Sequence, residues 1–489
     1  GVSLDSNLSN TQSLSVGYEE SGFGIAADVA RDQYSPDRER SDFDMWSTSL
    51  AGTADVAWFS GRLRGWYTPS SYQMPGGLTD EAFEDDPADA VNDDDAIEET
   101  EYGAELTPEA TFGALSLRAP VSASVTESEV DFASFPSYYD SALTSVDAAI
   151  LASYEAFIGP SLALTPTVGF DYRRARLAVD RYQTEERDSV FFEASLARNV
   201  YAPWGRLRAS WRDLVIAEAG VRYEYADLEA TSDDDGLDGG DAHSPVVFDA
   251  GVTYLPADEI KLSARYGRTF RYPALDEQVS YFGFGTDTLY DDLNPETGHS
   301  ITLGAEYDDG TAGVSVSPFV TWMTDEIVYD AAAFRNENAG ETLHYGSTVD
   351  ASYTLGAVTT AAGYRYTRAE VSSGANEGNL APLVPAHSVS GEVSAELPFG
   401  FGAGTDVSYT SGYYPGGDEA NDAEMIPGRT TWNARISWTG DFGLTAYLAA
   451  KNILDDRTPT NAYYNSFSDA TTWYPMPGRT FEAGASWSY

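Results

Sequence analysis

The last ten residues, Thr480-Phe-Glu-Ala-Gly-Ala-Ser-Trp-Ser-Tyr489, decide the fold class. Small or polar side chains alternate here with apolar ones, which occupy Phe481, Ala483, Ala485, Trp487 and Tyr489. Successive side chains of a β-strand point to opposite faces. The segment therefore predicts a strand with one apolar face and one polar face.

The same alternation recurs along the chain, notably in residues 261–272, 432–438 and 444–448. A soluble β-sandwich also alternates, but it packs a dry core and its strands are usually shorter. Here charged residues such as Arg265 and Arg435 fall in mid-strand, and aromatic residues gather at strand ends. Short connections such as Asp308-Asp309-Gly310 alternate with long acidic ones. This combination is typical of outer-membrane barrels.

The charge, the cysteine content and the length of the apolar runs restrict the class of protein further. The chain has 489 residues, 28 Lys+Arg, 78 Asp+Glu and no Cys, for a formal charge of −50. So acidic a protein is not expected to bind nucleic acid, and it has neither disulfides nor a thiol nucleophile. No run approaches the roughly 18 apolar residues that a membrane helix needs. A membrane-spanning form must then be a closed barrel, because lipid leaves no partner for unpaired backbone groups.

The sequence therefore predicts an all-β fold, a membrane-spanning antiparallel up-and-down barrel. One strand with its share of turns takes roughly twenty or more residues, which gives about 22 strands. No break in composition separates a second domain, so residues 1–489 are expected to form one barrel. Its longest acidic extracellular loops are expected at residues 78–101 and 231–244.

Several motifs resemble the barrel of TonB-dependent outer-membrane receptors. The segments are Leu262–Glu277, Leu293–Thr297, Asn338–Gly340, Pro382–His387, Lys451–Asp456 and Tyr474–Phe481, followed by the terminal aromatic residue, with Tyr72–Gly77 near the start. Within them the residues that carry the resemblance are Arg271, Pro273, Asn294, Pro295, Glu296, Asn452, Pro477, Gly478, Arg479, Phe481 and Tyr489. Each motif is weak alone, whereas six in the family's order are specific, with the last two segments and the terminal aromatic residue counted as one closing motif.

These motifs are structural rather than chemical. Proline after a strand removes a hydrogen-bond donor and ends pairing. Gly478 and Asn452 are expected to adopt turn dihedrals that other residues avoid. The resemblance implies residence in the bacterial outer membrane, contact with lipid and lipopolysaccharide, and recognition of the C-terminal aromatic strand by the insertion machinery.

Family members also carry an N-terminal plug and an energy-coupling segment, whereas strand-like alternation begins here almost at Gly1. We therefore expect the plug to be lost or supplied by another chain, with a periplasmic energy-coupling protein as partner. The leading hypothesis is a transporter for a scarce ligand: a siderophore, a cofactor or an oligosaccharide. A structural anchor filled by a surface or periplasmic assembly partner and an unplugged diffusion pore are the alternatives.

Acidic loops are the one signal that the resemblance leaves unexplained. Twelve of the 22 positions from Asp80 to Glu101 are Asp or Glu. Two interpretations stay open: a solvated charge run, or Ca²⁺ ligands, since Ca²⁺ takes 6–8 oxygens. The candidate ligands are Asp85, Asp86, Asp93, Asp94, Asp95, Asp233, Asp234, Asp235 and Asp238. No other cofactor is expected.

Loop aromatics are the candidate ligand-binding residues: Tyr281, Phe282, Phe284, Tyr290, Tyr413 and Tyr414. The alternative is that they belong to an interfacial aromatic girdle. Catalytic residues are not indicated, because the four histidines stand in separate segments and no nucleophile motif is present. The sequence therefore predicts a transport protein and not an enzyme.

Overall fold

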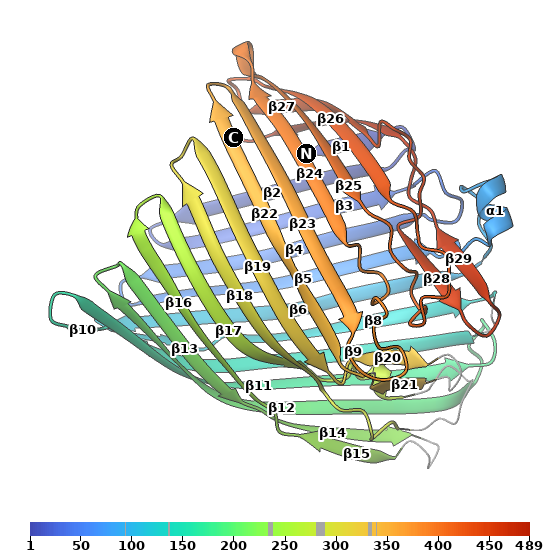
Figure 1. Ribbon diagram of the computed structural model, residues 1–489, viewed down its shortest axis with the longest axis horizontal. Helices are drawn as coiled ribbons and strands as arrows, with labels where there is room; N and C mark the ends of the chain where they lie inside the picture. Colours follow the sequence, from blue (N-terminus) through green and yellow to red (C-terminus); the bar gives the residue numbers. More distant parts are fainter. Residues whose placement is uncertain (93, 135–136, 233–237, 280–288, 331–334, 339) are drawn as a thin grey trace.

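The computed structural model describes residues 1–489 except 93, 135–136, 233–237, 280–288, 331–334 and 339. In this part of the chain nearly all regular structure is antiparallel β-sheet, curved into a closed wall (Figure 1). The only α-helix among the described residues is α1 (Asp80–Asp85), and no described helix is long and apolar enough to cross a bilayer.

One sheet of 26 segments makes the wall. Its uninterrupted strands are β1 (Val2–Asp5), β2 (Asn10–Glu20), β3 (Phe23–Tyr34), β4 (Phe43–Val56), β5 (Phe59–Gln73), β6 (Ala96–Phe112), β11 (Leu162–Tyr182), β12 (Val190–Trp211), β17 (Ile260–Arg271), β18 (Glu296–Asp308), β19 (Ala312–Thr324), β22 (Thr342–Leu355), β23 (Val358–Val371), β24 (His387–Glu396), β25 (Phe401–Thr410), β26 (Arg429–Thr439), β27 (Leu444–Lys451) and β30 (Thr480–Trp487).

Four further strands are each interrupted once, at a proline or a charged residue. They are β7 (Leu115–Arg118) with β8 (Val121–Phe132), β9 (Ser137–Tyr154) with β10 (Ala156–Ile158), β13 (Val215–Tyr223) with β14 (Tyr225–Ser232), and β15 (Gly239–His243) with β16 (Val246–Ala257). Counted as continuous strands, the described residues give 22. The predicted all-β barrel of about 22 strands is confirmed.

Closure joins the two ends of the chain. The first strand, β1, pairs with β2 on one side and with β30 on the other, where Val2 faces Ala485 and Asp5 faces Glu482. Every other neighbour is a sequential antiparallel partner, as in an up-and-down barrel. The sheet therefore has no free edge in lipid, which is the condition for β-structure to span a membrane.

Short turns and long loops lie at opposite ends of the barrel (Figure 1). The predicted turn after β18 is confirmed: Gly310 has φ of +80°, and Asp309 Oδ1 accepts the N–H groups of Thr311 and Ala312 at 2.8 Å. Two small hairpins stand among the long loops, β20 (Ile327–Asp330) with β21 (Arg335–Asn338) and β28 (Asn461–Asn465) with β29 (Ala470–Tyr474).

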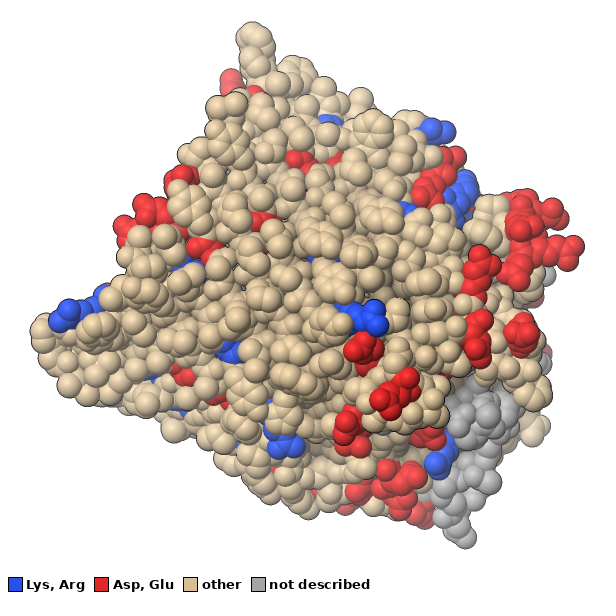
Figure 2. Space-filling view, viewed as in Figure 1, with Lys and Arg blue, Asp and Glu red and all other residues tan. Residues whose placement is uncertain are grey.

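Apolar side chains cover the outer face of the wall. Along β30 the predicted residues Phe481 and Trp487 are 59% and 62% exposed, as expected of side chains whose neighbour is lipid. Figure 2 shows a broad surface with few charges, with acidic residues gathered at the loop end of the molecule and a smaller number at the short-turn end. This distribution matches a barrel crossing a bilayer with its long loops on one side.

Strand lengths differ around the wall. A strand of ~9–11 residues spans a bilayer, whereas β11 has 21 residues and β12 has 22. These two strands therefore project beyond the membrane on the long-loop side. The expected loop 78–101 is shorter than the sequence indicates, because β6 begins at Ala96, and the 231–244 region contains β15.

Candidate functional site

The inner face of the wall carries the polar chemistry, and it repeats one small arrangement. Trp204 on β12 lies opposite Gly169 on β11, and a Cβ added to that glycine would stand 2.4 Å from the indole. Trp204 Nε1 donates to Asp171 Oδ1 at 3.1 Å, two residues along the glycine's strand. The missing Cβ thus lets the ring lie flat while its polar edge reaches a carboxylate.

Two more aromatic residues repeat this arrangement elsewhere on the inner face. Trp66 lies over Gly103 and donates to Glu101 at 2.8 Å. Tyr447 lies over Gly484 and donates to Glu482 in the same manner. The sequence gives no sign of these units, because they depend on which residues face each other across two strands.

A charged cluster lies on the inner face of the wall, at the interruption between β13 and β14. Glu224 stands at that break and is 2% exposed. Arg173 Nη2 donates to both of its carboxylate oxygens, at 2.9 and 3.1 Å, and Arg222 Nε donates to Oε1 at 2.5 Å. Arg222 also pairs with Asp171, the partner of Trp204. The buried carboxylate of Glu224 and the partly exposed carboxylate of Asp171 are therefore both compensated by guanidinium groups.

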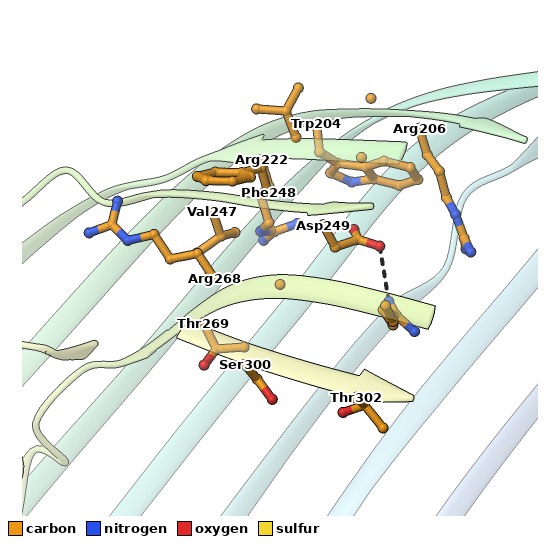
Figure 3. A pocket seen from close by; sticks show the side chains of 15 residues that line it. Trp204, Arg206, Arg222, Val247, Phe248, Asp249, Arg268, Thr269, Ser300 and Thr302 are labelled. Carbon is orange, nitrogen blue, oxygen red and sulfur yellow. Dashed lines mark hydrogen bonds and ion pairs between the residues drawn. The ribbon is translucent and has the colours of Figure 1, made fainter. Parts of the chain in front are cut away.

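Beside this cluster the wall is hollowed into a pocket of about 460 Å³ between β12, β13, β16, β17 and β18 (Figure 3). Arg222, Asp249 and Arg265 supply charge, and an ion pair of 3.0 Å joins Asp249 to Arg265. Ser300 and Thr302 add hydroxyl groups on the other side. The pocket offers hydrogen-bond donors and acceptors together with the flat ring of Trp204.

Above the pocket, the loop after β17 folds back onto the projecting strands. Leu275, Val279 and Leu289 pack against the inner side of β11, β12 and β14, where Val179 and Leu196 are almost fully buried. Tyr272 begins this loop, and burial together with the nearby Glu224 carboxylate raises its pKa. The described residues on either side of 280–288 thus pack as an apolar layer against these strands.

A second group of loops forms the opposite part of the mouth. Leu78 and Trp473 exchange two backbone hydrogen bonds, of 2.9 and 2.8 Å, and Trp473 Nε1 donates to Asp80 Oδ1 at 2.6 Å. Phe83 of α1 stacks on Trp473 at a centroid distance of 6.2 Å. The first and last long loops therefore hold each other, as α1 beside β29 in Figure 1 illustrates.

Residues of the sequence motifs bond to one another where the long loops join the strands. We call each such group of hydrogen bonds and ion pairs a clasp. Arg271 donates to both oxygens of Glu296 at 2.8 Å, and Asn338 exchanges hydrogen bonds of 2.8 and 3.0 Å with the backbone of Asn294. β17 ends at Arg271, two residues before Pro273, as predicted, and Pro295 precedes β18 directly. Three motifs far apart in sequence thus form one joint.

A matching clasp joins the last two motifs. Asn452, in a left-handed conformation at φ +48° as expected, donates to the carbonyl oxygens of Asp456 and Pro477 at 2.9 and 3.0 Å. The backbone N–H of Arg479 donates to Asp455 Oδ1 at 2.8 Å. Gly478 differs from the expectation, because no left-handed dihedral requires it. A Cβ there would lie 2.4 Å from Arg457 Nη2 and 2.8 Å from Asp37 Oδ2, so this glycine lies against the Arg457–Asp37 ion pair.

Hydrogen bonds also hold the carboxylate of Asp456 in this clasp. Burial by itself raises the pKa of Asp456, but donation from Thr458 and from the backbone N–H of Thr430, with the charge of Arg429 nearby, outweighs it. The pKa of Asp456 therefore lies below its usual value. The clasp is formed by the ionised acid.

The predicted aromatic ligand residues do not come together in the described part of the chain. Tyr413 is 5% exposed, accepts a hydrogen bond from Arg429 at 2.8 Å and packs against Ile426 and Trp473. Tyr290 is buried near the other loop group, and Tyr414 is half-buried. Tyr281, Phe282 and Phe284 lie outside the described residues. Their role in binding stays a prediction.

The predicted Ca²⁺ ligands are also dispersed. Asp95 is buried and accepts from Ser134 and Asn92, Asp86 caps α1, and Asp238 accepts from Ser232 N–H. Asp85 lies on α1 and Asp94 is exposed, while Asp93 and residues 233–235 lie outside the described residues. No group of three metal-binding side chains occurs among the described residues. Calcium binding remains a prediction.

Comparison with known proteins agrees with this architecture. The family model "TonB dependent receptor-like, beta-barrel" matches residues 3–453. The structure of the unliganded ferric citrate transporter FecA superposes with a TM-score of 0.87 at 19% identity, over 100% of this chain and 78% of that chain.

Two other solved structures give similar values. The ferric yersiniabactin uptake receptor FyuA from Yersinia pestis has a TM-score of 0.80 at 14% identity, over 99% of this chain and 78% of that chain. The copper transporter OprC has a TM-score of 0.81 at 16% identity, over 100% of this chain and 79% of that chain. At such identities the likeness concerns the fold.

The architecture and the match together define an outer-membrane receptor barrel. This chain belongs to the TonB-dependent receptor-like β-barrel family. Members of this family reside in the bacterial outer membrane and are transporters rather than enzymes. The predicted family, location and non-enzymatic class are confirmed.

Proposed function

We propose that this barrel imports a scarce ligand in an energised cycle, with a plug and the periplasmic TonB protein as partners. The observation that carries the proposal is the family match over residues 3–453, since such receptors are coupled to TonB through a plug. In this cycle the plug fills the lumen and contacts the inner wall, and it moves when the TonB protein transmits energy to it. The plug belongs to another chain or to a separate segment of the same protein.

A metal chelate is our first choice of ligand, ahead of a cofactor or an oligosaccharide. The similar structures include transporters named for ferric citrate, ferric yersiniabactin and copper. The inner wall of this chain also supports it, because Arg206, Arg222 and Arg265 line the pocket within an otherwise very acidic protein. Guanidinium groups suit the carboxylate and catecholate oxygens of chelators.

Transport by intact cells tests the proposal. Cells with and without the whole receptor gene are given labelled ferric chelates, with and without a protonophore. We expect uptake that needs both the gene and the proton gradient. Uptake unaffected by the protonophore, together with a large steady conductance in planar bilayers, would identify a passive pore instead. If the barrel instead purifies with another envelope protein at fixed stoichiometry and the cells show no uptake, it is a structural anchor.

A further inference from the structure

The hydrogen-bond ladder between β16 and β17 ends before the two strands do. Its uppermost pair is Asp249 with Gly267, although β16 begins at Val246 and β17 continues to Arg271. The ladders on both sides extend further: β13 pairs with β16 as far as Val246, and β17 pairs with β18 as far as Arg271. Among the described residues, 246–248 therefore have no ladder partner on β17, and the wall has an opening here toward the long-loop end.

One side chain crosses this opening. Arg268 Nη1 donates to the carbonyl oxygen of Val246 at 2.9 Å, at a place where a closed ladder would supply a backbone N–H group. The side chain of Arg268 lies between the two strands (Figure 3). The strands are thus linked here by a flexible side chain rather than by backbone pairing. We call the opening between residues 246–248 and 268–270 the β16–β17 window.

Aromatic contacts frame the window above and below. The ring centroids of His243 and Tyr272 lie 6.2 Å apart above it. The ring centroids of Phe248 and Tyr266 lie 5.8 Å apart below it. The window therefore has side chains from both of its edges in contact at its top and at its base.

The pocket beside the charged cluster opens into this window. Its lining includes Arg222 and Asp249, whose side chains face the lumen. It also includes their chain neighbours Val221 and Phe248, a cross-strand pair that faces outward and is 55% and 42% exposed. The cavity therefore touches both faces of the wall, and the window joins the lumen to the level of the lipid-facing side chains.

The two sides of this cavity differ in chemistry. Among the described residues that line it, four carry guanidinium groups, Arg206, Arg222, Arg265 and Arg268, and one carries a carboxylate, Asp249. The outward side is apolar. Backbone groups without a ladder partner are tolerated at membrane depth only where they are buried in protein or line a water-filled cavity. The site thus suits a molecule with an anionic polar part and an adjoining apolar part.

We propose that the β16–β17 window takes the apolar tail of an amphiphilic ligand whose anionic head lies in the pocket. The tail passes between the two strands into the outer leaflet, while Trp204 and the guanidinium groups hold the head inside. A ligand without a tail would occupy the pocket and leave the apolar side of the window unused. This inference rests on the proposed function, since it narrows the imported chelate to one that carries an acyl chain.

Paired cysteines in this cysteine-free chain test whether the strands stand apart. Val246→Cys/Phe270→Cys places two thiols across the window, and Val252→Cys/Ala264→Cys places them across a paired part of the same two strands. A disulfide needs Cα atoms within about 7 Å of each other. We expect rapid disulfide formation in the ladder pair and none in the window pair, which should instead accept a longer bismaleimide bridge. Equal disulfide formation in both pairs would overturn the proposal.

Binding to the full receptor in lipid nanodiscs tests the ligand class. The probes are two ferric complexes of one citrate-based hydroxamate, which carries a dodecanoyl chain in the first and an acetyl group in the second. We expect the dodecanoyl complex to bind at least tenfold more tightly, since burial of about two methylene groups suffices for tenfold. Bridging the window pair with the bismaleimide should reduce this ratio to about twofold or less, because the bridge occupies the path of the tail.

The ladder pair treated with the same reagent is the control and should retain the tenfold ratio. Because both variants stand in the same membrane, this comparison also removes the contribution of tail partitioning into the nanodisc. A ratio that the bridge leaves unchanged would overturn the proposal. Equal binding of the two complexes to the unmodified receptor would overturn this proposal alone, whereas binding of neither complex would overturn the proposed function with it.

Heat-modifiable migration on gels verifies that each variant is folded before the reagent is added. Where the window pair does not insert, the single change Phe248→Cys, alkylated with a benzyl maleimide, should lower the ratio in the same way. Val252→Cys treated alike should not lower it, and an equal effect at both positions would contradict a path through the window.

Discussion

The inner and outer faces of the same wall treat charge in opposite ways. Inside, carboxylates such as Glu224 and Asp171 are joined to guanidinium groups and to the edges of aromatic rings. Outside, β2 presents Leu14, Val16 and Tyr18 more than 60% exposed. Adjacent residues of one strand therefore face the aqueous lumen and the lipid in turn. A charged side chain is tolerated at one position and destabilising at the next.

The largest effect is expected from placing a charge on the lipid side. Val16→Arg should cost about 2–4 kcal/mol, as for arginine near the bilayer midplane. Its neighbour Ser15 faces inward opposite Asp28, so Ser15→Arg should change stability by less than about 1 kcal/mol. Denaturant titration of both variants in lipid vesicles gives the two values. Equal costs would break the distinction between the faces.

Removing an inner carboxylate comes next. Glu224→Ala leaves Arg173 and Arg222 without their shared partner and should destabilise the barrel by about 3 kcal/mol. Glu229→Ala, on the exposed side of the same strand, is the control and should change stability by less than about 0.5 kcal/mol. The unfolding midpoint of each variant checks the pair. A Glu224 variant as stable as the control would mean that the cluster contributes nothing.

A smaller effect tests the glycines beneath the inner aromatic rings. Gly169→Ala places a methyl group against the Trp204 indole and should cost about 1–3 kcal/mol. Gly52→Ala, where no atom lies within 4 Å of the added Cβ, should be neutral or stabilising. The same denaturant titration distinguishes them. Similar outcomes at the two sites would refute the role given to ring packing.

The smallest effect is local and depends on pH. Because the folded-state pKa of Asp456 is depressed, its contribution is present above the unfolded value of about 3.9 and is lost as pH falls through the folded value. Amide exchange of residues 452–480, corrected for intrinsic rates, should therefore accelerate below about pH 4. Asp456→Asn should show this faster exchange already at neutral pH. Protection in the variant that matches the original protein would contradict the clasp.

Fold class and strand number follow from the sequence because both depend on a period of two along single strands. The alternation around Phe481 and Trp487 needs no knowledge of neighbours. The family could also be predicted, because the motifs that resemble TonB-dependent receptors occur in that family's order. Gly310 and Asn452 were also predictable, since their turns depend on local dihedrals.

Cross-strand and loop contacts could not be predicted in the same way. The Trp204–Gly169–Asp171 unit and the Arg271–Glu296 pair arise from register and from contacts between distant segments. Asp95 looks like one more acid in a charge run, yet it is a buried anchor for Ser134. Tyr413, expected as a ligand contact, instead packs within the loop group that also holds Trp473.

The absence of cysteine from the chain permits one direct test of the two-faced wall. Single cysteines placed one at a time at residues 433–437 of β26 are reacted with a membrane-impermeant maleimide, in vesicles that leave the lumen accessible. We predict fast reaction at 433, 435 and 437, and protection with quenching by brominated lipid at 434 and 436. Uniform reactivity along the strand, or the reverse alternation, would contradict the barrel described here.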